Sequence, residues 1–339
     1  MTNKQAQQGF LLGVDVGSSK THALVADTSG EALGLGESGC GNYEVVGLEG
    51  FISAMQEAIQ NASKNAHIDS EHIIAMGFGI SGYDWPSEEP LMIQAIEALG
   101  IKCPYRFVND AVIGLIAGAK EGWGVAVDAG AGNNIRGLDQ NGRIGRITGN
   151  SAWFGEIGGG GEMVWLAQVA VTHAWTLRGP QTRLTQALMQ LAGVESEFAL
   201  IEGLAMERIN LPPTFAKDIF RIAQEGDRVA GEIVTTSAQE LALNVNAVIQ
   251  QLGLQKQSFD VVLIGSIFKA GAIYLEPFAQ VVKAFAPQAH LVQLSVPPVV
   301  GATLLAAENA GINPLHIRDQ CINSINALMN AEEPNSELT

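Results

Sequence analysis

Residues 10–27, FLLGVDVGSSKTHALVAD, decide the fold, because an apolar strand enters a turn of small residues and an alternating strand leaves it. The turn combines small, hydroxyl-bearing and cationic residues: Gly17, Ser18, Ser19, Lys20 and Thr21. Without a Cβ at Gly17 the chain can bend tightly and point backbone N–H groups at an anion. The stretch is therefore a candidate phosphate-binding turn, although an ordinary hairpin whose glycine serves only the bend explains it equally well.

The same pattern recurs in residues 123–139, WGVAVDAGAGNNIRGLD. Asp128 stands two residues before Gly130, as Asp15 stands two residues before Gly17. A carboxylate at the end of a buried strand is suited to holding a hydrated Mg²⁺. Two such units would present two phosphate turns and two carboxylates to one cleft, and we favour this interpretation over chance recurrence of a glycine hairpin.

The composition indicates a globular protein of two domains. The chain has 339 residues, of which 47% are hydrophobic, and a formal net charge of -16. A sequence pI near 4.7 argues against partners such as nucleic acid or an anionic membrane surface, which would be repelled at long range. A small anionic ligand stays possible where a turn and a metal ion supply positive potential.

The cysteines and the N-terminal residues favour a soluble, cytoplasmic protein. Cys40, Cys103 and Cys321 are odd in number and widely spaced, which suits a reducing compartment and offers no metal-cluster pattern. The first apolar run meets Asp15 too early for a signal peptide or a membrane span.

Hydrophobic periodicity predicts a ribonuclease-H-like α/β layer in the first third of the chain. After the two strands of the hairpin, the expected elements are a strand at 31–37, a helix carrying Leu48 to Ile59, a strand at 73–80, a helix at 91–99 and a strand at 105–108. The last of these strands delivers Asn109 and Asp110 to the start of another helix. A three-strand meander followed by alternating helices and strands is typical of this fold.

The second half combines a glycine-rich segment, a helical insertion and a return to α/β alternation. Residues 149–162 predict a mobile loop over a ligand, and residues 163–252 predict helices with no visible catalytic pattern and with His173 as a packed or surface residue. A buried strand at 259–264 feeds Gly265 and Ser266 into a helix that carries Lys269, which suits close approach of a nucleotide. A strand at 290–294, a helix at 299–310 and a frayed end at 331–339 follow.

Several of these segments together resemble the BadF/BadG/BcrA/BcrD group of the actin, Hsp70 and sugar-kinase superfamily, and within it the N-acetylglucosamine kinases. The resemblance covers about residues 10–311. It is carried by GVDVGSSKT at 13–21, VNDA at 108–111, DAGAGNN at 128–134, GSIFK at 265–269 and PVVGA at 298–302.

The resemblance implies two ribonuclease-H-like (actin-like ATPase) domains that face a nucleotide cleft, with the helical insertion in the second. The implied boundaries are 1–120 for the domain with the first phosphate hairpin, 121–311 for the domain with the second, and 312–339 for a tail that packs back on the first domain. The expected partner is a small sugar, with no nucleic acid and no membrane, and the expected assembly is a homodimer.

The implied reaction is phosphoryl transfer from MgATP to a sugar hydroxyl, with Asp110 as general base. An aspartate that only caps a helix is the alternative for Asp110. Asp15 and Asp128 would organise Mg²⁺ through water. ATP would be bound by the two glycine turns and the end of a later strand: Gly17, Ser18, Ser19, Lys20, Thr21, Gly130, Ala131, Gly132, Gly265 and Ser266. The residues expected to bind the sugar are Asn42, Gly82, Asp110, Asn134 and Trp153. A core anchor is the alternative for Trp153.

The sequence departs from the family pattern at positions where the family's residues contact the sugar. Where the kinases have a Gly-Asp-Glu-Gly segment, this sequence has four glycines at 158–161, and Glu44 replaces an aromatic residue. Ala131 and Asn133 stand where the kinases usually have threonine and serine. Glu156 or Glu162 could substitute for the missing acids.

Three functions therefore stay open. The first is an ATP-dependent hexosamine kinase acting on N-acetylglucosamine or glucosamine. The second is an ATPase that activates a partner enzyme, although the paired cysteines that hold an iron–sulfur cluster in such activators are missing from this sequence. The third is a sensor that binds ATP and sugar with weakened catalysis.

Overall fold

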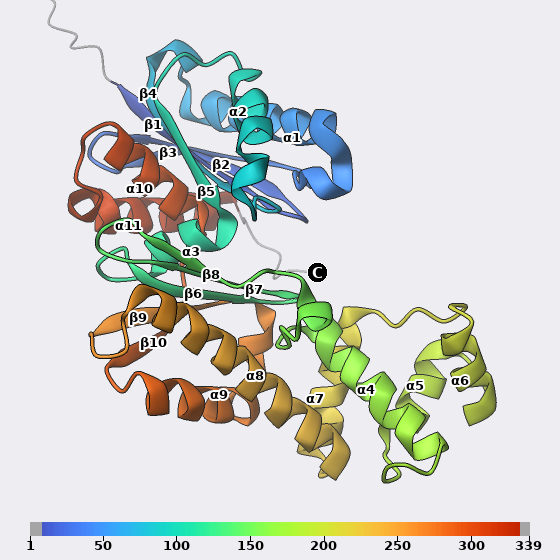
Figure 1. Ribbon diagram of the computed structural model, residues 1–339. Coiled ribbons are helices and arrows are strands. Elements are labelled where there is room, and N and C mark those ends of the chain that lie inside the picture. Colours follow the sequence, from blue (N-terminus) through green and yellow to red (C-terminus); the bar gives the residue numbers. More distant parts are fainter. Residues whose placement is uncertain (1–8, 333–339) are drawn as a thin grey trace, which may run out of the picture. The chain divides into compact units, whose positions relative to one another are not determined.

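The computed structural model describes residues 9–332 (Figure 1). Contacts along the chain divide it into two compact units. Within the described residues, the first unit runs to Ala126 and also includes 138–140 and the residues from Val292 onward, and the second comprises 127–137 and 141–291. Among the described residues, no helix is long and apolar enough to cross a membrane.

The first unit is built on a five-stranded sheet with the order β3-β2-β1-β4-β5. Its strands are β1 (Phe10–Val16), β2 (Thr21–Asp27), β3 (Ala32–Ser38), β4 (Ile73–Ile80) and β5 (Tyr105–Asn109). β1 pairs antiparallel with β2 and parallel with β4, so that Asp15 lies between His22 and Gly79. The three-strand meander and the two further strands expected from the sequence are confirmed, and these two strands are parallel to β1.

Helices cover both faces of this sheet. They are α1 (Tyr43–Ala66), α2 (Glu89–Glu97), α3 (Asp110–Gly118), α10 (Val299–Asn309) and α11 (Pro314–Glu332), with short 3-10 turns η1 (Ser70–His72) and η2 (Pro86–Glu88). One buried cluster joins the sheet to α1 and α2, and another joins its opposite face to α10 and α11. Gly301 lies directly against the backbone of Ile113, where a Cβ has no space, so α10 packs closely on α3.

The second sheet repeats the strand order of the first. It contains β6 (Gly124–Ala129), β7 (Asn133–Leu138), β8 (Ile144–Arg146), β9 (Phe259–Ile264) and β10 (Ala289–Gln293). Their order is β8-β7-β6-β9-β10 when read from the β8 edge. Each sheet therefore has in its centre the strand that enters the glycine turn, β1 or β6, as an internal repeat of one unit predicts.

The second unit contains the predicted helical insertion. Its helices are α4 (Gly160–Trp175), α5 (Leu184–Ala192), α6 (Glu197–Ala205), α7 (Ala216–Gln224), α8 (Arg228–Leu252) and α9 (Ala272–Phe285), and its 3-10 turns are η3 (Ser151–Phe154), η4 (Pro213–Phe215) and η5 (Ser266–Ala270). Breaks between these helices lie near Pro180 and Pro212.

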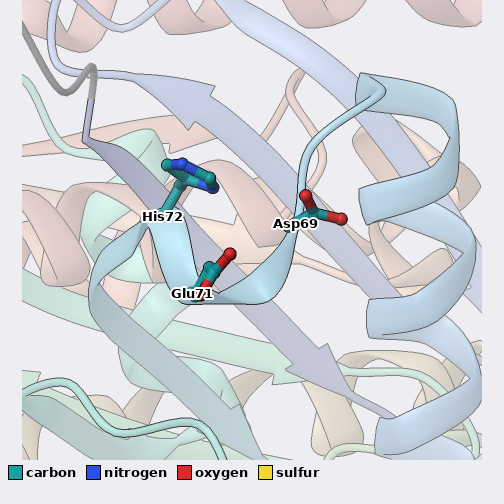
Figure 2. Close-up of side chains that lie close together, drawn as sticks. All are labelled: Asp69, Glu71 and His72. Atoms are coloured by element: carbon teal, nitrogen blue, oxygen red, sulfur yellow. The ribbon is translucent and has the colours of Figure 1, made fainter.

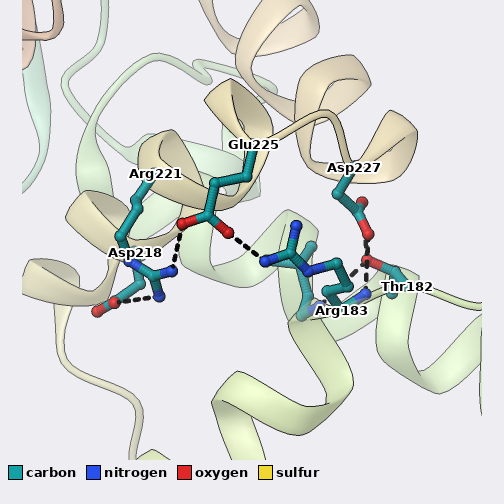
Figure 3. A network of polar contacts seen from close by, with 7 residues as sticks. Thr182, Arg183, Asp218, Arg221, Glu225 and Asp227 are labelled. Carbon is teal, nitrogen blue, oxygen red and sulfur yellow. Dashed lines mark hydrogen bonds and ion pairs between the residues drawn. The ribbon is translucent and has the colours of Figure 1, made fainter.

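Polar contacts fix the bend between α7 and α8 (Figure 3). Asp227 accepts hydrogen bonds from the backbone N–H groups of Ala230 and Arg183, at 2.9 and 2.8 Å, and from the Thr182 hydroxyl at 3.0 Å. Glu225 pairs with Arg183 and, at 3.0 Å, with Arg221. One carboxylate thus caps the 25-residue helix α8 and ties it to the segment before α5.

Three expectations about local structure change. Lys269 lies on the 3-10 turn η5 rather than on a helix. Residues 149–162 are not a loop throughout, because η3 lies within them and α4 begins at Gly160. The C-terminal segment carries a helix, α11, that ends at Glu332, and the remainder of the predicted frayed end lies outside the described residues.

Candidate functional site

The turn after β1 requires its glycine. The Gly17 N–H donates to the Lys20 carbonyl at 3.0 Å, and a Cβ on Gly17 would lie 2.7 Å from that oxygen. Ser18 and Ser19 are exposed at this turn. A narrow bend with exposed small residues leaves space for an anion beside the backbone.

The two residues after the serines face different surroundings. The Lys20 ammonium pairs with the Glu37 carboxylate at 2.7 Å and thereby lowers the pKa of Glu37. Thr21 is fully buried in β2, and its hydroxyl has no hydrogen-bond partner among the described residues. A Cβ on Gly41 would lie 2.5 Å from that hydroxyl, so Thr21 points toward the loop before α1.

Asn42 connects the first turn with two other segments. Its Nδ2 donates to Ser18 Oγ at 3.0 Å, and Ser18 Oγ lies 3.0 Å from Ser81 Oγ. Its Oδ1 accepts from the Glu44 N–H at 2.9 Å, which makes Asn42 the N-cap of α1. A Cβ on Gly82 would lie 2.8 Å from the same Oδ1. Three residues predicted from separate motifs, Ser18, Asn42 and Gly82, therefore lie together.

Asp110 is the first residue of α3, and the helix is capped by its neighbour. Asn109 Oδ1 accepts from the Ala111 N–H at 3.0 Å, so the alternative that treats Asp110 as the N-cap is wrong. Asn109 Nδ2 donates to Tyr83 O and Asp84 Oδ1, both at 3.2 Å. The half-buried Asp110 carboxylate stands at the N-terminus of α3.

Three carboxylates that the sequence did not predict as a group, Glu44, Asp84 and Glu88, lie near these residues. Glu88 accepts from the Tyr43 hydroxyl at 2.8 Å and from the Asp84 and Trp85 N–H groups at 2.8 and 2.7 Å. Burial and the neighbouring Glu88 raise the pKa of Tyr43. Partial burial, followed by the charges of Asp84 and Glu88, raises the pKa of Glu44. Glu44 was noted only as a departure from the family pattern, and its sequence position gives no sign of the other two carboxylates.

The second turn is open around its glycines. The Gly130 N–H donates to Gly132 O at 2.9 Å, and a Cβ on either glycine would meet nothing within 4 Å. Asp128 lies at the end of β6, where burial raises the pKa of its carboxyl to about 6. Among the described residues this carboxylate has no hydrogen-bond or ion-pair partner. A desolvated carboxylate that lacks a protein partner and lies beside an open turn fits the donor set that Mg²⁺ requires.

The glycine run 158–161 packs tightly against the second turn. The Gly160 and Gly161 N–H groups donate to Gly130 O and Ala131 O at 2.8 and 2.7 Å. A Cβ on Gly159 would lie 2.5 Å from the Gly132 backbone. At this position, the acid found in the kinases has no space in this chain.

Glu156 and Glu162 are both buried and both engaged in the loop itself. Glu156 accepts from Thr148 N at 2.7 Å, from Thr148 Oγ1 at 2.9 Å and from Asn150 N at 3.0 Å. Glu162 accepts from the Gly159 N–H at 2.7 Å and from the Ser151 hydroxyl. These bonds organise the segment that bears Trp153, which makes both residues supports of the loop.

Trp153 is 94% exposed on η3, so the alternative that treats it as a core anchor is wrong. Its neighbour Phe154 is 66% exposed. Two adjacent aromatic rings held in solvent by a hydrogen-bonded loop are available to a ligand.

A pocket of about 570 Å³ lies beside the second turn. Residues of the turn, the start of α4, the η4–α7 segment and η5 line it: Gly130, Ala131, Gly160, Pro213, Thr214, Ala216, Lys217, Phe220, Ser266, Ile267, Lys269 and Ala270. Gly265, at φ +99°, lies against the Ala129 carbonyl and thereby brings Ser266 to the pocket. Asn134, in β7, is half-buried and does not line it.

Sequence reasoning missed the contribution of the helical insertion to this pocket. Lys217 and Phe220 are one turn apart on α7, so that both side chains reach the same side. The only sequence signal is the Pro212-Pro213 break that starts this segment, and it does not reveal which helix face meets the sheet.

A second group of possible metal ligands lies elsewhere in the first unit. Asp69, Glu71 and His72 surround η1 with ligand atoms within 4.8 Å of one another (Figure 2). Both carboxylates are exposed, and groups of this kind are common on protein surfaces without a metal. We assign them no role in the site.

Known proteins resemble the chain over most of its length. The family model described as the BadF/BadG/BcrA/BcrD ATPase family matches residues 12–306. An N-acetyl-D-glucosamine kinase of Dictyostelium discoideum is 28% identical over 310 residues, which are 88% of this chain and 97% of the relative.

Solved structures show the same fold. A candidate N-acetylglucosamine kinase of Chromobacterium violaceum matches with a TM-score of 0.65 at 20% identity, over 88% of this chain and 99% of the other. A ROK-family glucokinase of Streptomyces griseus, solved with glucose and AMPPNP, matches with a TM-score of 0.54 at 19% identity, over 88% and 98% of the two chains.

Proposed function

Because the chain belongs to the BadF/BadG/BcrA/BcrD ATPase family, we propose that it is an ATP-dependent kinase that phosphorylates a hydroxyl of a hexosamine. The observation that carries this proposal is the pocket beside the second turn. It combines an open glycine turn with Lys217 and Lys269 in a protein whose net charge is -16. Local positive charge at an open turn is what an acidic protein needs to bind a polyanionic nucleotide.

We assign the nucleotide to the second unit. Its phosphates would be bound at Gly130, Ala131 and Gly132, and its base and ribose would lie between Phe220 and Ser266. Asp128, and Asp15 in the first unit, would hold Mg²⁺ through water, and this ion supplies positive charge to the transferring phosphoryl group. Gly17 to Lys20 would bind phosphate oxygens, whereas Thr21, expected from the sequence to take part, is fully buried and would support the turn from behind.

The first unit would bind the sugar. Asn42, Gly82 and Asp110 lie at the ends of neighbouring segments, and Asp110 would accept the proton of the attacking hydroxyl as general base. Asn134 and Trp153 complete the proposed sugar contacts. The domain boundaries proposed for this division are 1–120, 121–311 and 312–339.

The leading acceptors are N-acetylglucosamine and glucosamine. The support is the relative from Dictyostelium discoideum, an N-acetyl-D-glucosamine kinase that is similar over nearly the whole chain. Glu44, Asp84 and Glu88 place negative charge near Asn42, which favours an acceptor with an ammonium group, so glucosamine should be compared directly with its acetylated form.

The test is sugar-dependent ADP release by the purified protein, screened over hexoses, amino sugars and N-acetylated sugars. We expect a hexosamine to give turnover, and Asp110→Asn to lower the rate at least about a hundredfold with ATP affinity retained. Asn109→Ser keeps a helix cap beside Asp110 and is the matched control for the stability of α3. Undiminished turnover of Asp110→Asn would remove the assigned base.

A sensor with weakened catalysis is the second candidate, favoured by one observation. Glu156 and Glu162 are occupied within their loop, and there is no space for the family's acid at Gly159. Calorimetry that detects binding of ATP and a sugar, with no ADP formed, would select this function. We further propose that the protein is a homodimer, which light scattering on the purified protein tests. The proposed location is the cytoplasm.

A further inference from the structure

The helical insertion contains a second pocket, separate from the one assigned to the nucleotide. Its volume is about 470 Å³. It lies between α4, the end of α6 and the segment that leads to η4, and its lining residues are Gly161, Val164, Trp165, Gln168, Leu204, Glu207, Ile209, Asn210 and Leu211. None of them lines the pocket of about 570 Å³. A concavity of this size can enclose a ligand of one or two rings.

The lining combines one aromatic ring with planar polar groups. Trp165 is 46% exposed, and Gln168 lies one turn further along the same face of α4. Asn210 and Glu207 supply a second carboxamide and a carboxylate. Two carboxamides, each both donor and acceptor, and a carboxylate that only accepts match a ligand with several hydroxyl or amino groups.

The charge of the pocket disfavours a phosphorylated ligand. No lysine or arginine occurs among the described residues that line it. The nearest arginine in the chain, Arg208, pairs with Glu202 at 3.0 Å. Since Glu207 contributes a negative charge, a neutral or cationic ligand is favoured over an anion.

Glu207 occupies a backbone conformation that favours glycine. Its φ is +54°, and the chain turns back here through the Arg208 N–H, which donates to Gly203 O at 2.8 Å. A non-glycine residue with left-handed backbone geometry is held there at a cost of about 1 kcal/mol. Glu207 lines the pocket, where glycine would leave no side chain.

We propose that this pocket is a binding site for an unphosphorylated saccharide, distinct from the sites for the nucleotide and the acceptor. The flat C–H face of a sugar ring would pack on Trp165, and its hydroxyl or amino groups would bind Gln168, Asn210 and Glu207. The site does not depend on the proposed kinase reaction, because binding there involves no nucleotide.

The pocket is joined to the second turn through two short segments. Gly161 lines it and also donates its N–H to Ala131 O at 2.7 Å. Leu211 lines it, and Pro213, two residues later, lines the pocket assigned to the nucleotide. A saccharide bound here would therefore contact the segments that shape the nucleotide site.

The experiment uses the full chain labelled with 5-fluorotryptophan, which gives five ¹⁹F signals, each assigned by a Trp→Phe variant. The protein is titrated without nucleotide with glucosamine, N-acetylglucosamine, chitobiose and, as a separate arm, adenosine. Trp175 is the internal control, because it lies on the same helix with 41% exposure and does not line the pocket. We expect a saccharide to shift the Trp165 signal saturably while the Trp175 signal stays in place.

Variants separate this pocket from other sugar sites. Gln168→Ala should weaken the response at Trp165 by about tenfold in Kd, since two hydrogen bonds to the ligand are lost. In the same variant, any saturable response at Trp153 should keep its midpoint. A Trp165 signal that no saccharide moves, that moves in parallel with Trp175, or that only adenosine moves, overturns the assignment.

Discussion

Tyr274 donates its phenolic O–H to the carbonyl of Gly158 at 2.7 Å, so a fully buried side chain of α9 fixes the start of the glycine run. The same hydroxyl lies 3.4 Å from Ser237 Oγ on α8. The run continues into the two N–H groups that bind the second turn. The position of the second glycine turn therefore depends on a residue more than 100 positions away in the chain.

Replacing Tyr274 by phenylalanine should destabilise the protein by about 1–3 kcal/mol, because the Gly158 carbonyl loses its partner while staying buried. The measurement is the denaturant midpoint. Phe278→Leu, a change in the same core without a lost hydrogen bond, is the control. The two variants are compared under conditions where they are equally stable. If nucleotide affinity falls in Tyr274→Phe and is kept in Phe278→Leu, the hydrogen bond positions the turn. Equal nucleotide affinity in both variants would contradict this.

Replacing Gly159 by aspartate, the residue that the family's kinases have at this position, should not create a contact with the sugar. The new Cβ would meet the Gly132 backbone at 2.5 Å, so Gly159→Asp is expected to lose about 2 kcal/mol or more of stability and to lower turnover. Gly231→Ala is the matched control, since its Cβ would meet nothing within 4 Å on α8 and should add roughly 0.5–1 kcal/mol. Higher turnover of Gly159→Asp would show that the run can open.

The free energy of unfolding should depend on pH through the Asp128 carboxyl, over a range set by the pKa of that group. Burial raises the folded-state pKa of this carboxyl to about 6, well above its ordinary value of 3.8, so the folded protein binds the proton more tightly than the unfolded chain does. The contribution is favourable below pH 4 and is lost as the pH rises through 6. Asp128→Asn should therefore be more stable than the unsubstituted protein by about 3 kcal/mol at pH 8 and about equally stable near pH 4.

Binding of MgADP provides an independent test of the role proposed for Asp128. MgADP should raise the melting temperature of the original protein, and Asp128→Asn should lose most of that increase. Asp260→Asn, on the neighbouring strand β9, is the control for removing one acid from this sheet. A full MgADP response in Asp128→Asn would remove the metal role proposed for Asp128.

The sequence predicts the sheets better than it predicts the site. Both central strands and the start of α3 at Asp110 follow from local patterns, because each strand carries its own alternation and each turn its own glycine, whereas the cap of that helix is Asn109 and not Asp110. The nucleotide pocket does not, since Lys217 and Phe220 reach it through the packing of α7, which no local pattern encodes. The glycine run was expected to be a loop because glycine disfavours helices, yet close packing on the second turn requires glycine there.

Asn42 should combine two separable roles, one in helix capping and one in holding the first turn. Asn42→Asp keeps an acceptor for the Glu44 N–H but loses the donor to Ser18, so we expect a stability change within about 0.5 kcal/mol. Asn42→Ala loses both and should cost about 1–2 kcal/mol. Sugar affinity, measured by calorimetry, should fall in both variants; if Asn42→Asp keeps it, the amide does not contact the acceptor.

Asp227 should make the helical insertion sensitive to acid. Partial burial works to raise the pKa of Asp227, but hydrogen bonds from Ala230, Arg183 and Thr182 outweigh it, and the pKa is lowered. A lowered pKa stabilises the folded state above the unfolded value of about 4, and this contribution is lost as the pH falls through the folded value. Asp227→Ala should thus cost about 1–2 kcal/mol at pH 7 and progressively less in acid. Asp218→Ala, which removes only an exposed ion pair with Arg221, should cost less than about 0.5 kcal/mol, and an equal loss in both variants would show that the cap contributes nothing of its own.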